Sequence, residues 1–241
     1  MHKRVAATAI VIALAWGSPA VADTITIGAT NSPNLFPFGV GPGEANAYFG
    51  TYQQIYAAAA FGGRISISQI AFTTVTVGDS VLPLTSAFSL SIGTTSASPS
   101  VLGFNYSANR RPDLVQVFTG SISIASTGRS AFDFVIPFST PFEYDPSVGN
   151  LLLDVFIRNN SRGPVGFAGG DTWMTGRVYN FDGTGSPNAG PNRALLTRFS
   201  STEVDPVPEP ATFGLLASGL SAIYARRRRR RSEAMPADSS T

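Results

Sequence analysis

Hydrophobic and polar residues alternate along most of the chain between residues 23 and 207. A period of two puts successive side chains on opposite faces of an extended backbone, whereas a helix repeats every 3.6 residues. Each alternating segment therefore predicts a β-strand with one buried face and one face in water. The clearest segments are 64–68, 88–92, 115–117, 122–124 and 132–136.

Other strands are expected where apolar residues gather between turn signals. Residues 151–157 are apolar at nearly every position and predict a central strand buried on both faces. About ten short strands without helical periodicity predict an all-β fold, an antiparallel β-sandwich of the jelly-roll type. The further strands are expected at 24–28, 48–58, 69–77, 151–158, 173–180 and 194–199, and the turns at 112–113, 126–128, 145–150 and 159–164.

Residues 45–60 allow two interpretations. Their alanines and glutamines favour a helix, and Tyr48, Tyr52 and Tyr56 recur every four residues. Tyr52, Gln54 and Tyr56 also share one face of a strand, and glycines flank the segment. We favour the strand.

The first 22 residues have the pattern of a secretory signal peptide. His2, Lys3 and Arg4 form a basic start, residues 5–16 are apolar, and Ala20-Val21-Ala22 is a small-residue cleavage site. The apolar run would form a helix of about 18 Å, well short of the roughly 30 Å of a bilayer core. We therefore expect signal peptidase to release a chain that begins at Asp23. The alternative is an ordinary N-terminal core helix.

The C-terminal region has three parts in a fixed order. Pro208, Glu209 and Pro210 precede an apolar run at 213–225, which is expected to form a short transmembrane helix. Six arginines follow, and their side chains can reach the membrane interface and hold the C-terminus in the cytoplasm. These arginines are Arg226, Arg227, Arg228, Arg229, Arg230 and Arg231.

This arrangement resembles the PEP-CTERM sorting signal of Gram-negative bacteria that make extracellular polysaccharide. The resemblance covers residues 208–231. It implies that the exported protein is held in the inner membrane until an exosortase, a membrane transpeptidase, cuts near Pro-Glu-Pro and passes the protein onward. Such proteins usually stop soon after the arginines, whereas here residues 232–241 follow, a tail that we expect to be disordered. A plain C-terminal membrane anchor is the alternative, because a helix and arginines suffice for one.

Parts of the body, residues 23–207, also resemble a recurrent class of PEP-CTERM proteins of unassigned biochemical function. The similar segments are 52–58, 65–72 and 141–154. The last of these has a simple physical interpretation, since a turn at 145–150 leads into a buried strand. The resemblance therefore concerns fold and destination rather than activity.

The composition removes several kinds of chemistry from the body. The chain has no Cys, its one His is His2, and its one Lys is Lys3. No thiolate nucleophile, Ser-His-Asp triad, Cys/His zinc site or Schiff-base lysine can form once the signal peptide is removed. The whole chain has a formal charge of +2, but residues 23–209 hold nine basic and thirteen acidic residues, which gives −4. We therefore expect no nucleic-acid partner.

Catalysis in the body would have to depend mainly on carboxylates. A glycosidase needs two of them across a groove, and Glu44, Glu143 and Glu203 lie near loops, a proline or the linker. Asp133 and Asp154 lie in expected strands, opposite apolar faces, where a solvent-facing charge or a local ion pair would explain them. We expect a non-enzymatic body with no catalytic residues. The alternative is a secreted carbohydrate-active hydrolase or lyase on a β-sandwich.

Residues 169–183 form the best candidate ligand-binding segment. They hold Trp173, the one Trp of the mature chain, with Arg177, Tyr179 and Asn180 nearby. Aromatic rings can stack on sugar faces while amide and guanidinium groups bond to hydroxyls. The alternative is that Trp173 lies in the core and the rest of the segment forms turns.

A metal site has weaker support in the sequence. Asp171, Asp182 and Asn188 could supply oxygen ligands to Ca²⁺, but the D-x-D-x-D-G spacing of a calcium loop is missing. We therefore expect no cofactor.

Taken together, these patterns predict an exported protein that is anchored transiently in the inner membrane and then delivered to the cell surface or extracellular matrix. The expected role is structural or polysaccharide-associated. The expected partners are signal peptidase and an exosortase during export, and extracellular polysaccharide afterwards.

Overall fold

A computed structural model describes residues 22–32, 34–39, 49–76, 84–102, 104–124, 132–160, 165–180, 188–190 and 193–204. Residues 1–21 of the predicted signal peptide, the segment 208–231 and the tail 232–241 lie outside them. The described strands belong to one compact unit that ends at Glu203. In the described part of the chain, no helix is long and apolar enough to cross a membrane.

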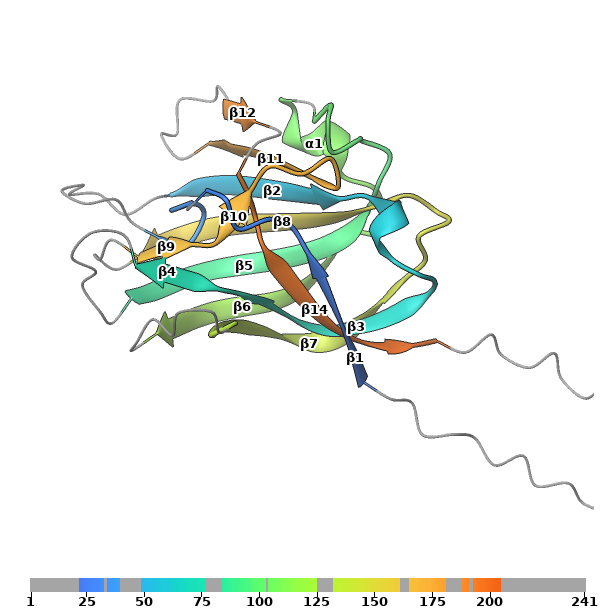
Figure 1. Ribbon diagram of the computed structural model, residues 1–241, viewed down its shortest axis with the longest axis horizontal. Helices are drawn as coiled ribbons and strands as arrows, with labels where there is room; N and C mark the ends of the chain where they lie inside the picture. The colour runs from blue at the N-terminus through green and yellow to red at the C-terminus, as the bar shows by residue number, and fades with distance from the viewer. Residues whose placement is uncertain are drawn as a thin grey trace, which may run out of the picture. The chain divides into compact units, whose positions relative to one another are not determined.

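Two antiparallel sheets form the body, as the alternation predicted (Figure 1). The first has the order β1-β14-β3-β7 and the second has the order β12-β11-β2-β8-β5-β6. In the first sheet the strands are β1 (Ala22–Ile27), β14 (Thr197–Glu203), β3 (Ile65–Phe72) and β7 (Phe134–Tyr144). In the second sheet they are β12 (Asn188–Gly190), β11 (Thr175–Asn180), β2 (Gly50–Tyr56), β8 (Asn150–Asn160), β5 (Leu84–Thr95) and β6 (Val115–Ile124).

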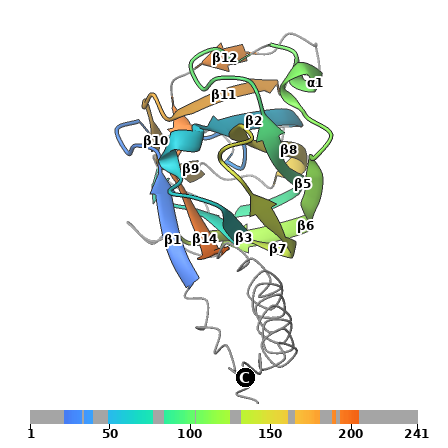
Figure 2. The same cartoon turned by 90° about the vertical axis from the view of Figure 1, so that its right-hand side faces the viewer.

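Smaller elements complete the unit. Two short ladders pair β4 (Thr74–Thr76) with β9 (Val165–Phe167), and β10 (Gly169–Gly170) with β13 (Ala194–Leu195). A 3-10 turn at Ala58–Ala60 follows β2, and the single-turn helix α1 (Tyr106–Asn109) precedes β6. In both views, α1 lies near β11, at the end of the six-stranded sheet away from β7 (Figures 1 and 2).

The core lies between the two sheets and is rich in aromatic rings. Phe88 of β5 and Phe134 of β7 come from opposite sheets, and both are fully buried. Phe38, from the segment that precedes β2, lies between them with its ring centroid 4.9 Å from that of Phe88 and 4.7 Å from that of Phe134. Buried aromatic pairs add to the hydrophobic free energy of the core, so this loop residue helps to join the sheets.

Most strands lie where the sequence pattern predicts them, but the predicted boundaries between some strands are wrong. The strand interpretation of 48–58 is confirmed for Gly50–Tyr56, which form β2, and the helical alternative is wrong for these residues. The segments expected at 115–117 and 122–124 are parts of the single strand β6. Their alternation is interrupted because Thr119, Gly120 and Ser121 are all exposed. The turn expected at 126–128 lies outside the described residues.

Two further differences have simple physical causes. Strand β7 runs through Pro137 and Pro141, which a strand tolerates at the edge of a sheet because it needs hydrogen bonds on one side only. Helix α1 was not predicted, because four residues are too few to show a helical period.

Candidate functional site: the polar clusters of strand β2

Strand β2 carries two adjacent glutamines in the middle of the six-stranded sheet. Gln53 and Gln54 are both fully buried, and neighbouring residues of a strand point to opposite faces. Gln54 shares the inner face with Tyr52 and Tyr56, which belong to the core, so Gln53 faces outward. A buried amide is costly unless it is hydrogen-bonded, and the two glutamines therefore need partners in two different layers.

On the inner face, Gln54 bonds to the backbone of β13. Its Oε1 accepts the Leu195 N–H at 2.8 Å and the Tyr52 hydroxyl at 2.6 Å, while its Nε2 donates to the Leu195 carbonyl at 2.9 Å. Nearby, the Tyr56 hydroxyl and the Thr197 hydroxyl lie 2.7 Å apart. These bonds attach the six-stranded sheet to the segment that enters β14. Burial raises the pKa of the Tyr52 and Tyr56 phenols, so both remain neutral donors at ordinary pH.

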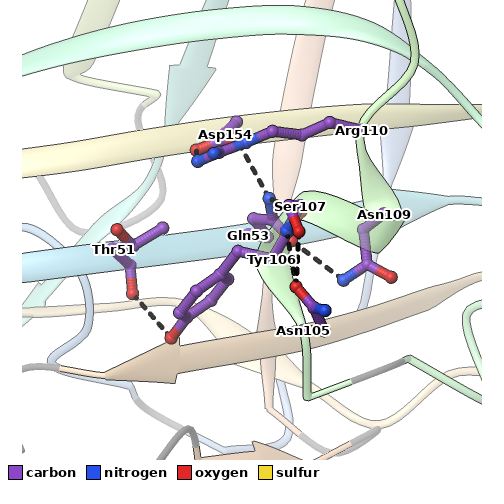
Figure 3. Close-up of polar contacts among 8 residues, drawn as sticks. All are labelled: Thr51, Gln53, Asn105, Tyr106, Ser107, Asn109, Arg110 and Asp154. Atoms are coloured by element: carbon purple, nitrogen blue, oxygen red, sulfur yellow. Dashed lines mark hydrogen bonds and ion pairs between the residues drawn. The ribbon is translucent and has the colours of Figure 1, made fainter. Parts of the chain in front are cut away.

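On the outer face, Gln53 takes part in a cluster with Asp154 of β8 and the α1 segment (Figure 3). The Nε2 of Gln53 donates to Asp154 Oδ2 at 2.8 Å and to the Tyr106 carbonyl at 3.2 Å. Its Oε1 accepts from Asn109 Nδ2 at 2.9 Å. Arg110 Nε pairs with Asp154 Oδ2 at 2.5 Å, and this bond raises the pKa of the arginine.

Local sequence explains how α1 forms above this cluster. Asn105 is the N-cap, and its Oδ1 accepts the Ser107 N–H at 3.0 Å and the Ser107 hydroxyl at 2.7 Å. Asparagine at this position satisfies a helix donor that has no partner within the helix. The Tyr106 hydroxyl donates to the Thr51 carbonyl at 3.3 Å, which attaches the helix to β2 (Figure 3).

The cluster is built for support rather than for acid–base chemistry. Asp154 is 6% exposed and accepts hydrogen bonds from both Gln53 and Arg110. Of the two explanations that the sequence allowed for this residue, a solvent-facing charge and a local ion pair, the structure shows the ion pair. Asp133 is engaged in a similar way, because its carboxylate accepts the backbone N–H of Thr74 at 3.0 Å and the Thr74 hydroxyl. Both carboxylates hold other segments in place.

The four residues singled out for ligand binding do not share one surface. Trp173 lies in the turn before β11 and is 71% exposed, so it is not a core residue. Arg177 and Tyr179 pair with Gln54 and Tyr52 of β2 and so share its inner face, with the guanidinium 4.9 Å from the Tyr179 ring centroid. Asn180 alternates to the outer face and is buried.

A different aromatic pair lies on the outer face. Phe49 is 55% exposed, Phe156 of β8 is 38% exposed, and their rings meet edge to face at 5.4 Å. This pair was not predicted, because the apolar run 151–157 indicated a strand buried on both faces. The strand register sets Phe156 in a row of uncharged side chains that crosses five strands: Asn180, Thr51, Phe156, Ser89 and Thr119.

Two acidic residues line one cavity. Asp23 of β1 and Glu203 of β14 line a cavity of about 220 Å³ together with Arg64. Arg64 also lies 3.6 Å from Asp145, in an exposed pair. Glu143 is exposed on β7, and Glu44 lies outside the described residues.

The described residues do not bring together the three candidate calcium ligands, Asp171, Asp182 and Asn188. The carboxylate of Asp171 accepts the Arg193 N–H at 2.7 Å, and Asp182 lies outside the described residues. The side chain of Asn188 is also outside them. In the part of the chain that the structure describes, three or more acidic, His or Cys residues do not gather in one place.

Substituting Arg110 tests the role of the outer cluster. Arg110→Met leaves the Asp154 carboxylate buried without its counter-charge, and because Arg110 is itself 41% exposed we expect a loss of about 2 kcal/mol in the free energy of unfolding. Arg111→Met is the matched control, since Arg111 donates to the Val148 carbonyl at an exposed site, and we expect about 0.5 kcal/mol or less. Urea denaturation measures both. Equal losses in the two variants would contradict the assignment.

Comparison with known proteins identifies a family motif in one part of the chain. Residues 206–230 match the model of the PEP-CTERM protein-sorting motif. No curated protein and no solved structure matches the chain. The matched segment contains Pro208-Glu209-Pro210 and most of the arginine run, as the resemblance predicted. The chain therefore carries a PEP-CTERM sorting motif, which indicates an exported protein that is processed at the membrane and recognised by an exosortase during sorting.

Proposed function

We propose that the body is a non-enzymatic structural or polysaccharide-associated component of the cell surface or extracellular matrix. The observation that carries this proposal is the exposed aromatic pair Phe49 and Phe156 on the outer face of the six-stranded sheet, where the strand register sets Phe156 in a row with hydroxyl and amide side chains. Aromatic rings bind the apolar faces of sugars, and hydroxyl and amide groups bond to sugar hydroxyls. A row of this kind fits a glycan chain.

The strand order supports the finer assignment of a jelly roll. When β1, β2, β3, β5, β6, β7, β8 and β14 are numbered one to eight in chain order, one sheet contains strands 1-8-3-6 and the other contains strands 2-7-4-5. Eight strands divided between two sheets by two Greek keys define a jelly roll. Strands β11 and β12 then extend the second sheet beyond β2.

The route of the protein follows from its two ends. Signal peptidase cuts before Asp23, and the apolar run at 213–225 holds the protein in the inner membrane with Arg226 to Arg231 in the cytoplasm. An exosortase then acts near Pro208-Glu209-Pro210, and the body reaches the surface or the matrix.

A carbohydrate-active hydrolase is the second candidate. It is favoured by Asp23 and Glu203, which line one cavity. Glycosidases use two carboxylates across a sugar-binding groove. The cavity of about 220 Å³ is smaller than the roughly 300 Å³ at which ligand pockets usually begin, and so the binding role is preferred.

Changing the sorting motif tests the route. Replacing Pro208, Glu209 and Pro210 by alanine removes the recognised sequence but keeps the apolar run and the arginines, so the full chain should accumulate in the inner-membrane fraction of an exosortase-producing host. Replacing Val204 and Asp205 by alanine is the control and should leave the distribution unchanged. A plain membrane anchor would give the same inner-membrane location for all three proteins, which cell fractionation would show.

Removing the exposed rings tests the binding role. We expect Phe49→Ala combined with Phe156→Ala to weaken binding to the host's extracellular polysaccharide about tenfold, since each ring contributes up to roughly 1 kcal/mol of stacking. Val148→Ala is the control, because Val148 is an equally exposed apolar residue in the β7–β8 turn. A glycan array and sedimentation with the purified polysaccharide measure the binding.

The same assays also distinguish a binding protein from a carbohydrate-active enzyme. Release of reducing sugar that Asp23→Asn or Glu203→Gln abolishes would refute the non-enzymatic role. Unchanged binding by the Phe49 and Phe156 variant would refute the assigned surface. Loss of binding in Trp173→Ala instead would move the site to the turn before β11.

A further inference from the structure

Strand β6 is an edge strand with unusual chemistry for its position. It is ten residues long, and within the described residues its hydrogen-bonded neighbour is β5 alone. Its sequence, VQVFTGSISI, contains no charged residue and no proline. A long uncharged edge presents backbone N–H and C=O groups to any strand that approaches it.

The other outer edges of the two large sheets carry the usual forms of protection. Strand β12 is three residues long, and β7 contains Pro137 and Pro141. Strand β1 carries the charge of Asp23. Short length, prolines and charges are the devices by which β-proteins prevent pairing between sheet edges. Strand β6 has none of these three. The irregularity in its pairing lies at Val117 near its start, and Phe118 to Ile124 pair regularly with β5.

The middle of β6 is also accessible. Thr119, Gly120 and Ser121 are all exposed, although a strand covered on one face would bury every second residue. Val115 at its start is 46% exposed. Strands β6 and β7 lie side by side in both views without pairing (Figures 1 and 2).

Apolar surface continues beside this edge. A groove of about 280 Å³ lies between β6 and β7, and half-buried Phe118 and Phe138 contribute to its walls. A strand that extended the sheet beyond β6 would also cover part of this groove. Backbone hydrogen bonds and apolar burial would then act together.

We propose that β6 pairs antiparallel with β6 of a second copy of this chain and joins the two six-stranded sheets into one continuous sheet. Two-fold pairing sets a strand against itself, so any charge on it would meet a like charge in a nearby position. Strand β6 has no charge, and its outward positions Thr119, Ser121 and Ser123 would meet hydroxyl side chains of the partner. This inference is independent of the polysaccharide-binding proposal.

Single cysteines test the pairing in the intact chain. The protein has no Cys, so Thr119→Cys introduces its one thiol, and a short membrane-permeant bismaleimide tolerates small shifts in register. We expect a covalent dimer in cells that export the full chain. Thr26→Cys is the matched control, since Thr26 is exposed on the edge strand β1, and at least tenfold less dimer is expected from it.

A second substitution makes the result specific. Ser121→Lys, added to Thr119→Cys, places like charges at the paired edge and should reduce the dimer at least tenfold, whereas Thr26→Lys added to the same background should not. Protease resistance of the exported chain checks that each variant is folded. The proposal is overturned if Thr119→Cys gives no more dimer than Thr26→Cys. It is also overturned if adding Ser121→Lys leaves the amount of dimer unchanged.

Discussion

The body depends on the burial of two amide groups in strand β2. Gln53 and Gln54 point to opposite faces of the six-stranded sheet, and each bonds to the segment that covers its face, Gln53 to the α1 segment and Gln54 to β13. A slip of one residue would exchange the two faces and leave both amides without these partners. The pair therefore fixes the register of β2 and attaches both β13 and α1 to it. Apolar side chains alone would permit more arrangements.

Two carboxylates of the described body are also held by hydrogen bonds. Asp154 is bonded to Arg110 and Gln53, and Asp133 holds the start of β4. Residues 23–241 contain no His and no Cys, two residue types often used in acid–base catalysis. The exposed rings of Phe49 and Phe156 and the hydroxyl groups of β6 suit contact with a glycan or with another copy. The sorting motif supplies the destination, and the surfaces of the sheets supply the role that we propose there.

The sequence allowed the fold class to be predicted because alternation is a local signal. Residues 64–68 and 88–92 show it directly and lie in β3 and β5. Long-range partners leave no such signal: Gln54 bonds to Leu195 across 141 positions, and Arg110 reaches Asp154 across 44. Phe38 enters the core from a segment with no periodic pattern.

The candidate site was less accessible from the sequence. Trp173 and Arg177 are neighbours along the chain, yet one is exposed in a turn and the other is buried on the inner face. The exposure of Phe156 was not predicted, because the apolar residues on both sides of it indicated a fully buried strand. Its neighbours on the outer face, Thr51 of β2 and Ser89 of β5, are known only from the strand register. The sorting motif was the exception, since its three parts follow one another in the chain.

The unfolding free energy of Gln54→Leu is the most direct measurement of the central claim. Leucine has a similar size but accepts no hydrogen bond, so the Leu195 N–H and the Tyr52 hydroxyl would remain buried without their partner. We expect a loss of about 3 kcal/mol relative to Gln69→Leu, because each buried donor costs roughly 1 to 3 kcal/mol. Gln69 is half-buried and bonds to the Ser200 hydroxyl. Equal stability of the two variants in urea would contradict the account.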